Sequence, residues 1–282
     1  MIDLHTHSTA SDGMLTPAEL VREAVRVGIE VLSLTDHDTL SGLPEASREA
    51  SRVGLEFIPG VEISAVFDPG TMHILGYFID PSDATLAGTL SWLRGGRDER
   101  NGLILARLAE LGCPLDPEEI EDLAGGESVG RPHIAKAMMA RGYVSSFQEA
   151  FDRYLGKGAA AYMDREKMTP EKAIEEIINA GGLPVLAHPQ TLSLDNEGLG
   201  KLVDSLESFG LAGVEAYYYS HSMEETVFYL SLARRFGLAV TGGSDFHGPG
   251  AIDSRLGVGR GDMDVPREIA DKLIKRYQAA VR

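Results

Sequence analysis

Short apolar segments recur along the chain, and each is followed by a longer amphipathic stretch. The segments cover residues 2–4, 31–34, 57–61, 73–78, 183–187, 213–217 and 238–241. A buried strand followed by a covering helix, repeated several times, is typical of a parallel sheet with helices packed outside it. The pattern therefore predicts a closed or nearly closed α/β barrel.

Three helix starts are marked by capping residues. Thr16 and Ser222 are each followed three positions later by a glutamate, and Thr16 and Thr169 are each followed directly by a proline. The hydroxyl of such a residue accepts from the free N–H groups of the first turn, and proline at the first helical position loses no hydrogen bond. Helices are therefore expected to begin at these three positions.

The strand pattern stops between about residues 90 and 165, where the sequence becomes helical. Apolar residues at 103–108 recur with helical spacing, and a fresh helix start follows at 116–119. We therefore predict an inserted helical domain over residues 91–164. The barrel domain is then formed by residues 1–90 and 165–282.

Composition excludes several classes of protein. The 282 residues include 43 acidic and 26 basic side chains, and a formal charge of −17 argues against a broad surface that grips duplex DNA. No apolar run is long enough to span a membrane. The single cysteine, Cys113, rules out an intramolecular disulfide and a thiolate zinc site. The first residues lack the features of a signal peptide, so we expect a cytoplasmic protein.

Six of the eight histidines lie in or next to predicted strand ends. His5 and His7 are two residues apart after the first segment, as are Asp245 and His247 after the last. Side chains two apart on an extended chain point to the same side, and the carboxyl ends of parallel strands meet at one edge. These groups are therefore expected to form one site.

Nitrogen and carboxylate ligands without thiolates suit Zn²⁺, Mn²⁺ or Fe²⁺. Glu62 follows a third segment and has two oxygens that can bridge two cations, so two or three ions are expected. The alternative to metal binding is a structural role for these histidines, because a single histidine in a loop is more often a surface residue. It applies most to His73, which opens its apolar segment instead of ending it.

Several motifs together resemble the polymerase and histidinol phosphatase (PHP) family of metal-dependent phosphoesterases. They are His5-Thr6-His7-Ser8, Ser11-Asp12-Gly13, Leu34-Thr35-Asp36-His37-Asp38, Gly60-Val61-Glu62-Ile63, His73, Ala187-His188-Pro189 and Gly243-Ser244-Asp245-Phe246-His247. The resemblance implies an α/β fold, a distorted (β/α)7 barrel with a three-metal centre, joined here by the inserted small helical domain. It implies one metal at His5, His7, Glu62 and Asp245, a second at Glu62, His73 and His188, and a third at Asp12, His37 and His247.

Within the family, the chain is most similar to the branch that removes the 3′-phosphate from 3′,5′-bisphosphonucleotides and trims short RNA from its 5′ end. The similarity rests on residues 130–135, 154–158 and 161–162. It implies attack by a hydroxide that bridges the metals, with Asp245 and His247 in the catalytic centre. The partners are then a small nucleotide or another phosphate ester, and short single-stranded RNA.

Substrate-binding residues are expected in the insertion, at Ser128, Arg131, His133 and Lys157. Arg131 offers a planar fork and Lys157 a mobile charge for a second phosphate, although Arg131 could instead pair with an acid of this acidic chain. His133 or His221 could protonate the leaving oxygen, because imidazole titrates near neutral pH. A structural role for His221 is an equal alternative.

Two other functions compete with this one. A phosphatase for histidinol phosphate or another small phosphomonoester would use the same metals without Arg131 and Lys157. A non-catalytic, metal-loaded nucleotide-binding module is the alternative from another class. No Ser-His-Asp or Cys-His nucleophile is evident in the sequence.

Overall fold

The computed structural model describes residues 1–124, 129–164, 167–249 and 254–280. Within these residues a seven-stranded sheet follows the order of the chain. Its strands are β1 (Ile2–Asp3), β2 (Val31–Leu34), β3 (Glu56–Ala65), β4 (Met72–Tyr77), β5 (Leu183–Leu186), β6 (Gly213–Tyr218) and β7 (Ala239–Gly243). The N–H of Leu4 donates to the carbonyl of Gly242 at 3.2 Å, so the first strand also meets the last. The predicted α/β barrel is confirmed.

Strand β4 departs from the predicted parallel order. It is antiparallel to both β3 and β5, whereas the other neighbouring strands are parallel. Only residues 66–71 separate β3 from β4, and a connection this short can join antiparallel strands but not parallel ones. The beginning of β4, with His73, therefore lies at the edge where the parallel strands end.

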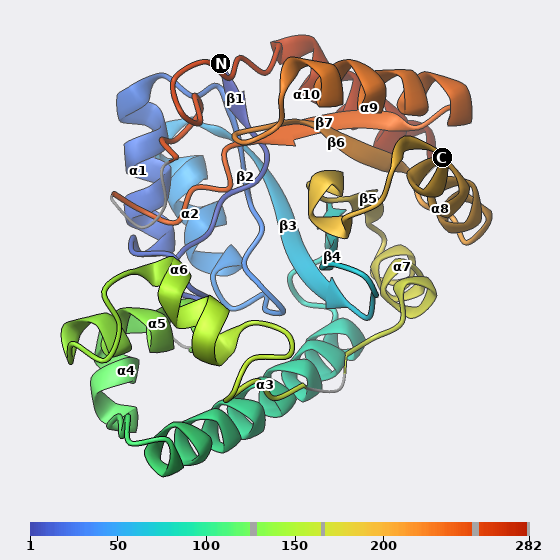
Figure 1. Cartoon of the computed structure of the whole chain (residues 1–282). Coiled ribbons are helices and arrows are strands. Elements are labelled where there is room, and N and C mark those ends of the chain that lie inside the picture. Colours follow the sequence, from blue (N-terminus) through green and yellow to red (C-terminus); the bar gives the residue numbers. More distant parts are fainter. Residues whose placement is uncertain (125–128, 165–166, 250–253, 281–282) are drawn as a thin grey trace.

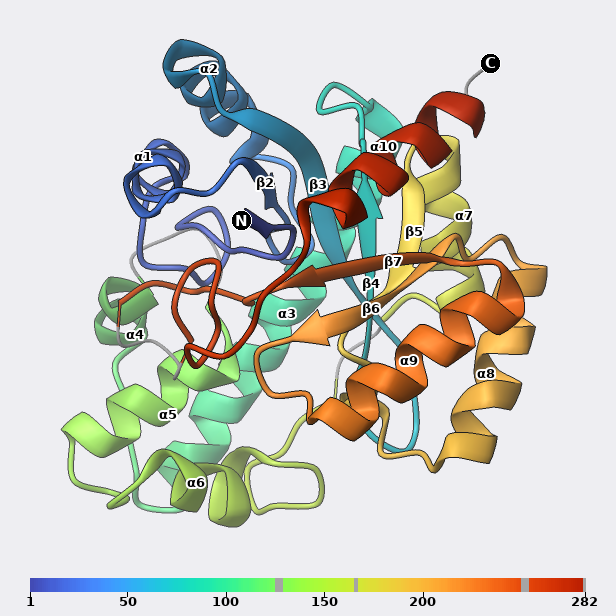
Figure 2. The same ribbon diagram turned by 90° about the horizontal axis from the view of Figure 1, so that it is seen from above.

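Helices cover the outside of the barrel and one of its ends (Figures 1 and 2). The outer helices are α1 (Pro17–Val27), α2 (Leu43–Val53), α7 (Pro170–Asn179), α8 (Asn196–Ser208) and α9 (Met223–Phe236), and α10 (Arg267–Ala280) crosses the sheet in Figure 2. The three predicted helix starts are confirmed, because Thr16, Thr169 and Ser222 each accept a backbone N–H as N-cap.

Alternate residues of the strands supply two apolar cores. Val31 packs inside the barrel, whereas Leu32 packs against the outer helices. The inner cluster also includes Leu273 of α10, which therefore closes the end of the barrel opposite the carboxyl ends of the parallel strands. The open end is thus the one at which the predicted site residues lie.

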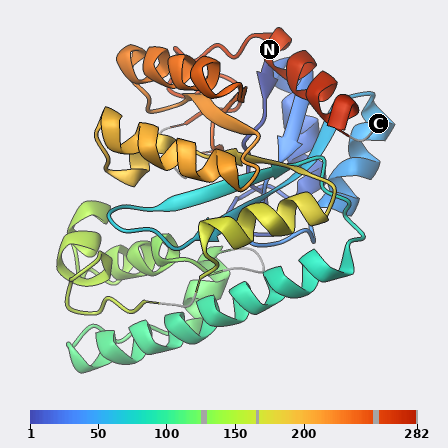
Figure 3. The same cartoon turned by 90° about the vertical axis from the view of Figure 1, so that its right-hand side faces the viewer.

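The insertion consists of helices with a cluster of their own. They are α3 (Ala84–Glu110), α4 (Pro117–Ala124), α5 (Arg131–Ala140), α6 (Phe147–Ala150) and the π-helix η1 (Phe151–Leu155). Outside the insertion, a 3₁₀ turn, η2 (Pro189–Leu192), follows β5. Leu86 and Leu93 pack on the barrel, whereas Ile104 packs with the insertion, and Figure 3 shows α3 running from one part to the other. The boundary at residue 90 lies inside α3, and the division into two domains stays a prediction.

No helix in the described part of the chain is long and apolar enough to cross a membrane.

Candidate metal centre and active site

The structure brings the nine predicted metal ligands to the open end of the barrel. His5, His7 and Asp12 follow β1, His37 follows β2, Glu62 lies in β3, His73 lies in β4, His188 follows β5, and Asp245 and His247 follow β7. Glu62 does not end its strand as predicted, because pairing with β4 extends β3 to Ala65. Its side chain is nevertheless level with the strand ends, since His37 and Glu62 form a parallel bridge.

Glu62 lies at the centre of the cluster and is 1% exposed. Its Oε2 is 3.3 Å from Nε2 of both His5 and His7, and 3.0 Å from Nδ1 of His37. Its Oε1 is 2.7 Å from Nδ1 of His73 and 2.9 Å from Nε2 of His188. The two oxygens therefore face different sets of imidazoles, as a bridging carboxylate must.

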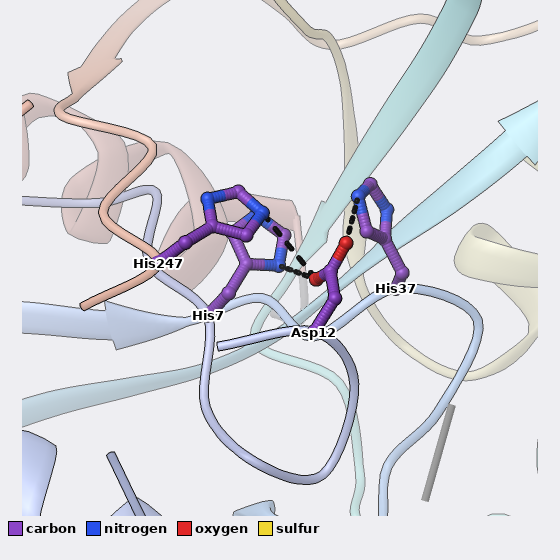
Figure 4. A group of neighbouring side chains, drawn as sticks. All are labelled: His7, Asp12, His37 and His247. Atoms are coloured by element: carbon purple, nitrogen blue, oxygen red, sulfur yellow. Dashed lines mark ion pairs between the residues drawn. The ribbon is translucent and has the colours of Figure 1, made fainter. Parts of the chain in front are cut away.

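Among the described residues, three groups of side chains each have ligand atoms that lie within 4.8 Å of one another. They are His5, His7, Glu62 and Asp245; His37, Glu62 and His73; and His7, Asp12, His37 and His247. Figure 4 shows the three histidines of the last group around the Asp12 carboxylate. Its oxygens lie 3.3 Å from Nε2 of His247 and 3.7 Å from nitrogens of His7 and His37. His7 and His37 thus each belong to two groups, an overlap absent from the predicted ligand sets.

Several of these atoms are buried without a hydrogen-bond partner among the described residues. They are Nε2 of His5, both ring nitrogens of His7, Nδ1 of His37 and Oε2 of Glu62. Buried polar atoms are normally satisfied, and a neutral imidazole and a carboxylate both offer lone pairs. Divalent cations that accept nitrogen and oxygen ligands fit this arrangement.

Burial and neighbouring charges set the protonation of the metal-free cluster. Burial opposes the charged form of His7, but the carboxylates of Asp245 and Glu62, 3.0 and 3.3 Å from its Nε2, raise its pKa to about 10. For His37 burial prevails and lowers the pKa to about 3. Burial also opposes ionisation of Glu62, yet His37, His73 and His5 hold its pKa well below the usual range. The cluster therefore combines a neutral imidazole, a protonated one and an ionised carboxylate.

The loop that carries Asp12 is held by Asp36, a residue not predicted to belong to the site. Asp36 is 2% exposed and accepts from the N–H and hydroxyl of Ser8, both at 2.7 Å, and from the hydroxyl of Ser11 at 2.6 Å. A Cβ on Gly13 would lie 2.5 Å from the carbonyl oxygen of His7, so the loop turns back closely on the ligands. The pattern Asp-His-Asp at residues 36–38 was the available signal.

A cavity of about 230 Å³ opens beside the cluster and is lined by Asp12, His37, His73 and three arginines. Arg131 was predicted here; its guanidinium donates to the carbonyl of Leu155 at 3.1 Å and lies 5.4 Å from the ring centre of Tyr162. Arg97 and Arg100 were not predicted as site residues, but both line the cavity and are only 7% and 6% exposed. Their three-residue spacing with Arg94 in a predicted helix was the signal.

The remaining predicted substrate residues are placed differently. Lys157 is 64% exposed, forms an ion pair with Asp68, and is not among the described residues that line the cavity. His133 is 3% exposed, and its Nδ1 accepts from the N–H of Gly130 at 3.0 Å. Ser128 lies outside the described residues.

His221 packs away from the predicted ligands. Its Nδ1 lies 3.0 Å from the carbonyl oxygen of Ala216, and its ring contacts those of Tyr218 and Tyr229 at centroid distances of 5.1 and 4.8 Å. Tyr218 stands between His221 and the cluster, because its hydroxyl donates to Asp245 at 2.8 Å. Tyr218 is therefore a further site residue that was not predicted.

Comparison with known proteins identifies the family. A model described as the PHP domain matches residues 3–281. The chain belongs to the PHP domain family. The 3′,5′-nucleoside bisphosphate phosphatase of Chromobacterium violaceum is 35% identical over 257 residues, which cover 88% of each protein. The 5′-3′ exoribonuclease Rnm of Escherichia coli is 38% identical over 249 residues, which cover 88% of this chain and 85% of that one.

A solved structure agrees with this assignment. A candidate metal-dependent phosphoesterase from Bifidobacterium adolescentis superposes with a TM-score of 0.85, at 29% identity, over 97% of this chain and 95% of that one. The distorted PHP barrel predicted from the sequence is thereby confirmed. The chain is a PHP hydrolase that acts on phosphoester bonds, with a candidate His/Asp/Glu metal site at the mouth of its barrel.

Proposed function

We propose that this PHP protein hydrolyses the 3′-phosphate of 3′,5′-bisphosphonucleotides and shortens RNA from its 5′ end. The observation that carries the proposal is that three candidate metal ligands border the same cavity as three largely buried arginines. The ligands are Asp12, His37 and His73, and the arginines are Arg97, Arg100 and Arg131. A substrate with two phosphates needs both features, one at the phosphate that is cleaved and one at the phosphate that is kept. The names of the two curated relatives point to the same substrates.

The proposed ligands follow the distances within the cluster. His5, His7, Glu62 and Asp245 would hold one divalent ion, Glu62 with His73 and His188 a second, and Asp12, His37 and His247 a third. Zn²⁺, Mn²⁺ and Fe²⁺ suit this set of nitrogen and oxygen atoms. When bound, such ions activate water and neutralise charge on the phosphoryl group.

The protein's own residues would orient the substrate. An arginine presents a planar fork to phosphate oxygens, and Arg97, Arg100 and Arg131 are held by helices α3 and α5. The low exposure of Arg97 and Arg100 means that little further side-chain entropy is lost when a phosphate binds. Lys157 keeps only a peripheral role in the proposal because it is exposed and pairs with Asp68, whereas Ser128 stays a proposed substrate residue.

For the proton on the leaving ribose oxygen we favour His133 over His221. Both are buried enough that their pKa values fall below the usual value. Asp12 acts electrostatically on His133 and favours its charged form, whereas Nδ1 of His221 is directed at a backbone carbonyl. The charge of Asp12 therefore acts on His133, and the residues that directly precede it, Arg131 and Pro132, line the cavity.

Substrate comparison tests the proposal. The metal-loaded protein should hydrolyse 3′,5′-bisphosphoadenosine much faster than adenosine 5′-monophosphate or histidinol phosphate, and it should release mononucleotides from a 5′-phosphorylated RNA pentamer. Equal rates on the three small substrates would remove the role assigned to the arginines and favour a general phosphomonoesterase.

The Asp245→Asn variant separates an enzyme from a non-catalytic binding module. It should lose metal and activity together, since Asp245 lies 3.0 Å from His7 at the centre of one ligand group. Parental activity in this variant would contradict the assignment of Asp245. We further propose a cytoplasmic setting, which suits the single buried thiol of Cys113, and small nucleotides and short single-stranded RNA as partners.

A further inference from the structure

Strand β6 supplies none of the proposed metal ligands, yet Glu215 in this strand contacts residues of two ligand groups. It is fully buried, at 0% exposure. Its Oε1 lies 3.0 Å from Nδ1 of His5, and its Oε2 accepts from the backbone N–H of His188 at 2.8 Å. Both oxygens of this carboxylate are therefore engaged by proposed ligands.

The contact with His5 determines which ring nitrogen is available to a metal. When Nδ1 carries the proton and donates to Glu215, Nε2 keeps its lone pair. That Nε2 lies 3.3 Å from Glu62 Oε2 and 3.4 Å from Asp245 Oδ1, in the middle of a candidate ligand group. A carboxylate behind an imidazole also fixes the ring orientation and makes the other nitrogen more basic.

The contact between Glu215 and His188 stabilises an unfavourable backbone conformation of His188. His188 has a φ of +23°, in the region that residues with a side chain rarely adopt. The hydrogen bond from its N–H to Glu215 stabilises this conformation. The ring of His188 is then directed at Glu62, with Nε2 2.9 Å from Oε1.

A β-bulge places a second group from the same strand at the site. The register of β6 against β7 shifts between Glu215 and Tyr217. Residues three apart in a regular strand face opposite sides, but the extra residue of a bulge changes this alternation. Glu215 and Tyr218 accordingly both contact proposed ligands, since the hydroxyl of Tyr218 donates to Oδ2 of Asp245 at 2.8 Å.

We infer that Glu215 is a positioning residue that aligns His5 and His188 for metal binding, with Tyr218 aligning Asp245. Glu215 acts through the two histidines and does not itself touch a metal or the substrate. This inference rests on the proposed ligand sets and adds a strand to the machinery that holds them.

The Glu215→Gln variant is the sharpest test. An amide has nearly the same shape, but it has one acceptor and one donor group where the carboxylate has two acceptors. If the amide oxygen accepts from His5, the amide NH₂ group faces the N–H of His188, and the reverse placement leaves His5 facing a donor. Glutamine therefore cannot satisfy both contacts while Nδ1 of His5 carries the proton.

The measurements are metal content after dialysis against graded chelator concentrations, and the melting temperature with and without added Mn²⁺ or Zn²⁺. Loss of such an outer carboxylate typically weakens metal binding about 10–100-fold. We expect a loss of this size for Glu215→Gln and a smaller one for Tyr218→Phe, together with a reduced metal-induced rise in melting temperature. The Tyr218→Phe variant keeps the test decisive if Glu215→Gln does not fold.

The matched control is Glu176→Gln. Glu176 is also buried, at 6% exposure, but it lies in α7 and pairs with Lys172 at 2.9 Å. This variant should bind metal like the parent. If Glu215→Gln and Tyr218→Phe retain metal like the parent, or lower only the metal-free melting temperature, the positioning role is wrong. If the parent itself binds no divalent ion, the ligand sets under the proposed function fail as well.

Discussion

Arg97 of helix α3 donates a hydrogen bond of 2.7 Å from Nη2 to Oδ2 of Asp38, which directly follows His37. Arg94 donates to the backbone carbonyl of Asp38 at 3.0 Å, and Asp38 accepts from the N–H of Ser64 at 2.9 Å. The insertion is thereby attached to the segment that carries a proposed ligand. The contact between Arg97 and Asp38 therefore connects the proposed substrate-binding part of the site to the proposed metal-binding part.

Replacing Arg97 should destabilise the protein strongly. The ion pair with Asp38 is largely buried, and removing one partner of such a pair leaves a buried charge, which typically costs about 3–5 kcal/mol. We expect a loss of this order for Arg97→Met in the free energy of unfolding from urea denaturation. Arg153→Met is the control, because its pair with Glu149 is exposed and screened by solvent, so this variant should lose far less stability. Similar losses in the two variants would contradict the buried-pair argument.

Arg131 and Lys157 should differ in their effect on substrate binding. A hydrogen bond to a charged group contributes about 1.5–3 kcal/mol, which corresponds to roughly 10–100-fold in affinity. Arg131→Ala should therefore raise KM for 3′,5′-bisphosphoadenosine at least tenfold and change KM for adenosine 3′-monophosphate little, since that substrate lacks the second phosphate. Lys157→Ala should stay within about twofold because Lys157 is exposed and pairs with Asp68. The reverse order would move the phosphate site from Arg131 to Lys157.

Metal binding should release protons near neutral pH. In the metal-free protein the pKa of His7 is about 10, so its imidazole is protonated at pH 7–8 and must lose a proton before it can bind a cation. Apparent metal affinity should consequently rise as the pH increases toward that pKa. Calorimetric titration in buffers of different ionisation enthalpy measures the released protons. Heats that do not depend on the buffer would show that His7 is already neutral.

Gly243 should not tolerate a side chain. A Cβ at this position would lie 2.5 Å from the Cβ of His5, where β7 closes against β1. We expect Gly243→Ala to lower the free energy of unfolding by about 1–3 kcal/mol and to reduce metal content, because His5 must shift. In Gly95→Ala a Cβ meets nothing within 4 Å in the middle of α3, so this control should gain about 0.5–1 kcal/mol. Thermal and urea unfolding of both variants provide the comparison.

The position of the cluster could be predicted from the sequence because its signals are local. His5 with His7 and Asp245 with His247 follow apolar segments at a spacing of two, and strand ends of a barrel converge. The direction of β4 was not predicted, because a segment of apolar residues has no intrinsic direction in a sheet. His73 therefore stood out as an exception, although the antiparallel course of β4 places it with the other ligands.

Contacts that depend on the packing of distant segments were harder to predict. Arg97 reaches Asp38 only when α3 lies across the mouth of the barrel. Glu215 faces the site next to a bulge, and the sequence does not show where a strand loses its regular alternation. A lone carboxylate within the apolar segment 213–217 was nevertheless an available signal.

The reversed course of β4 also sets a length that the chain must cover. Because this strand ends at the closed end of the barrel, the chain has to return to the open end, and the 27 residues of α3 span about 40 Å in doing so. Each residue of a helix adds about 1.5 Å of length and 100° of rotation. The number of residues in α3 therefore determines both how far it reaches and in which direction its side chains point. One residue inserted between Leu93 and Arg97 would therefore rotate Arg97 and Arg100 by about 100° relative to Leu93, away from Asp38 and the cavity.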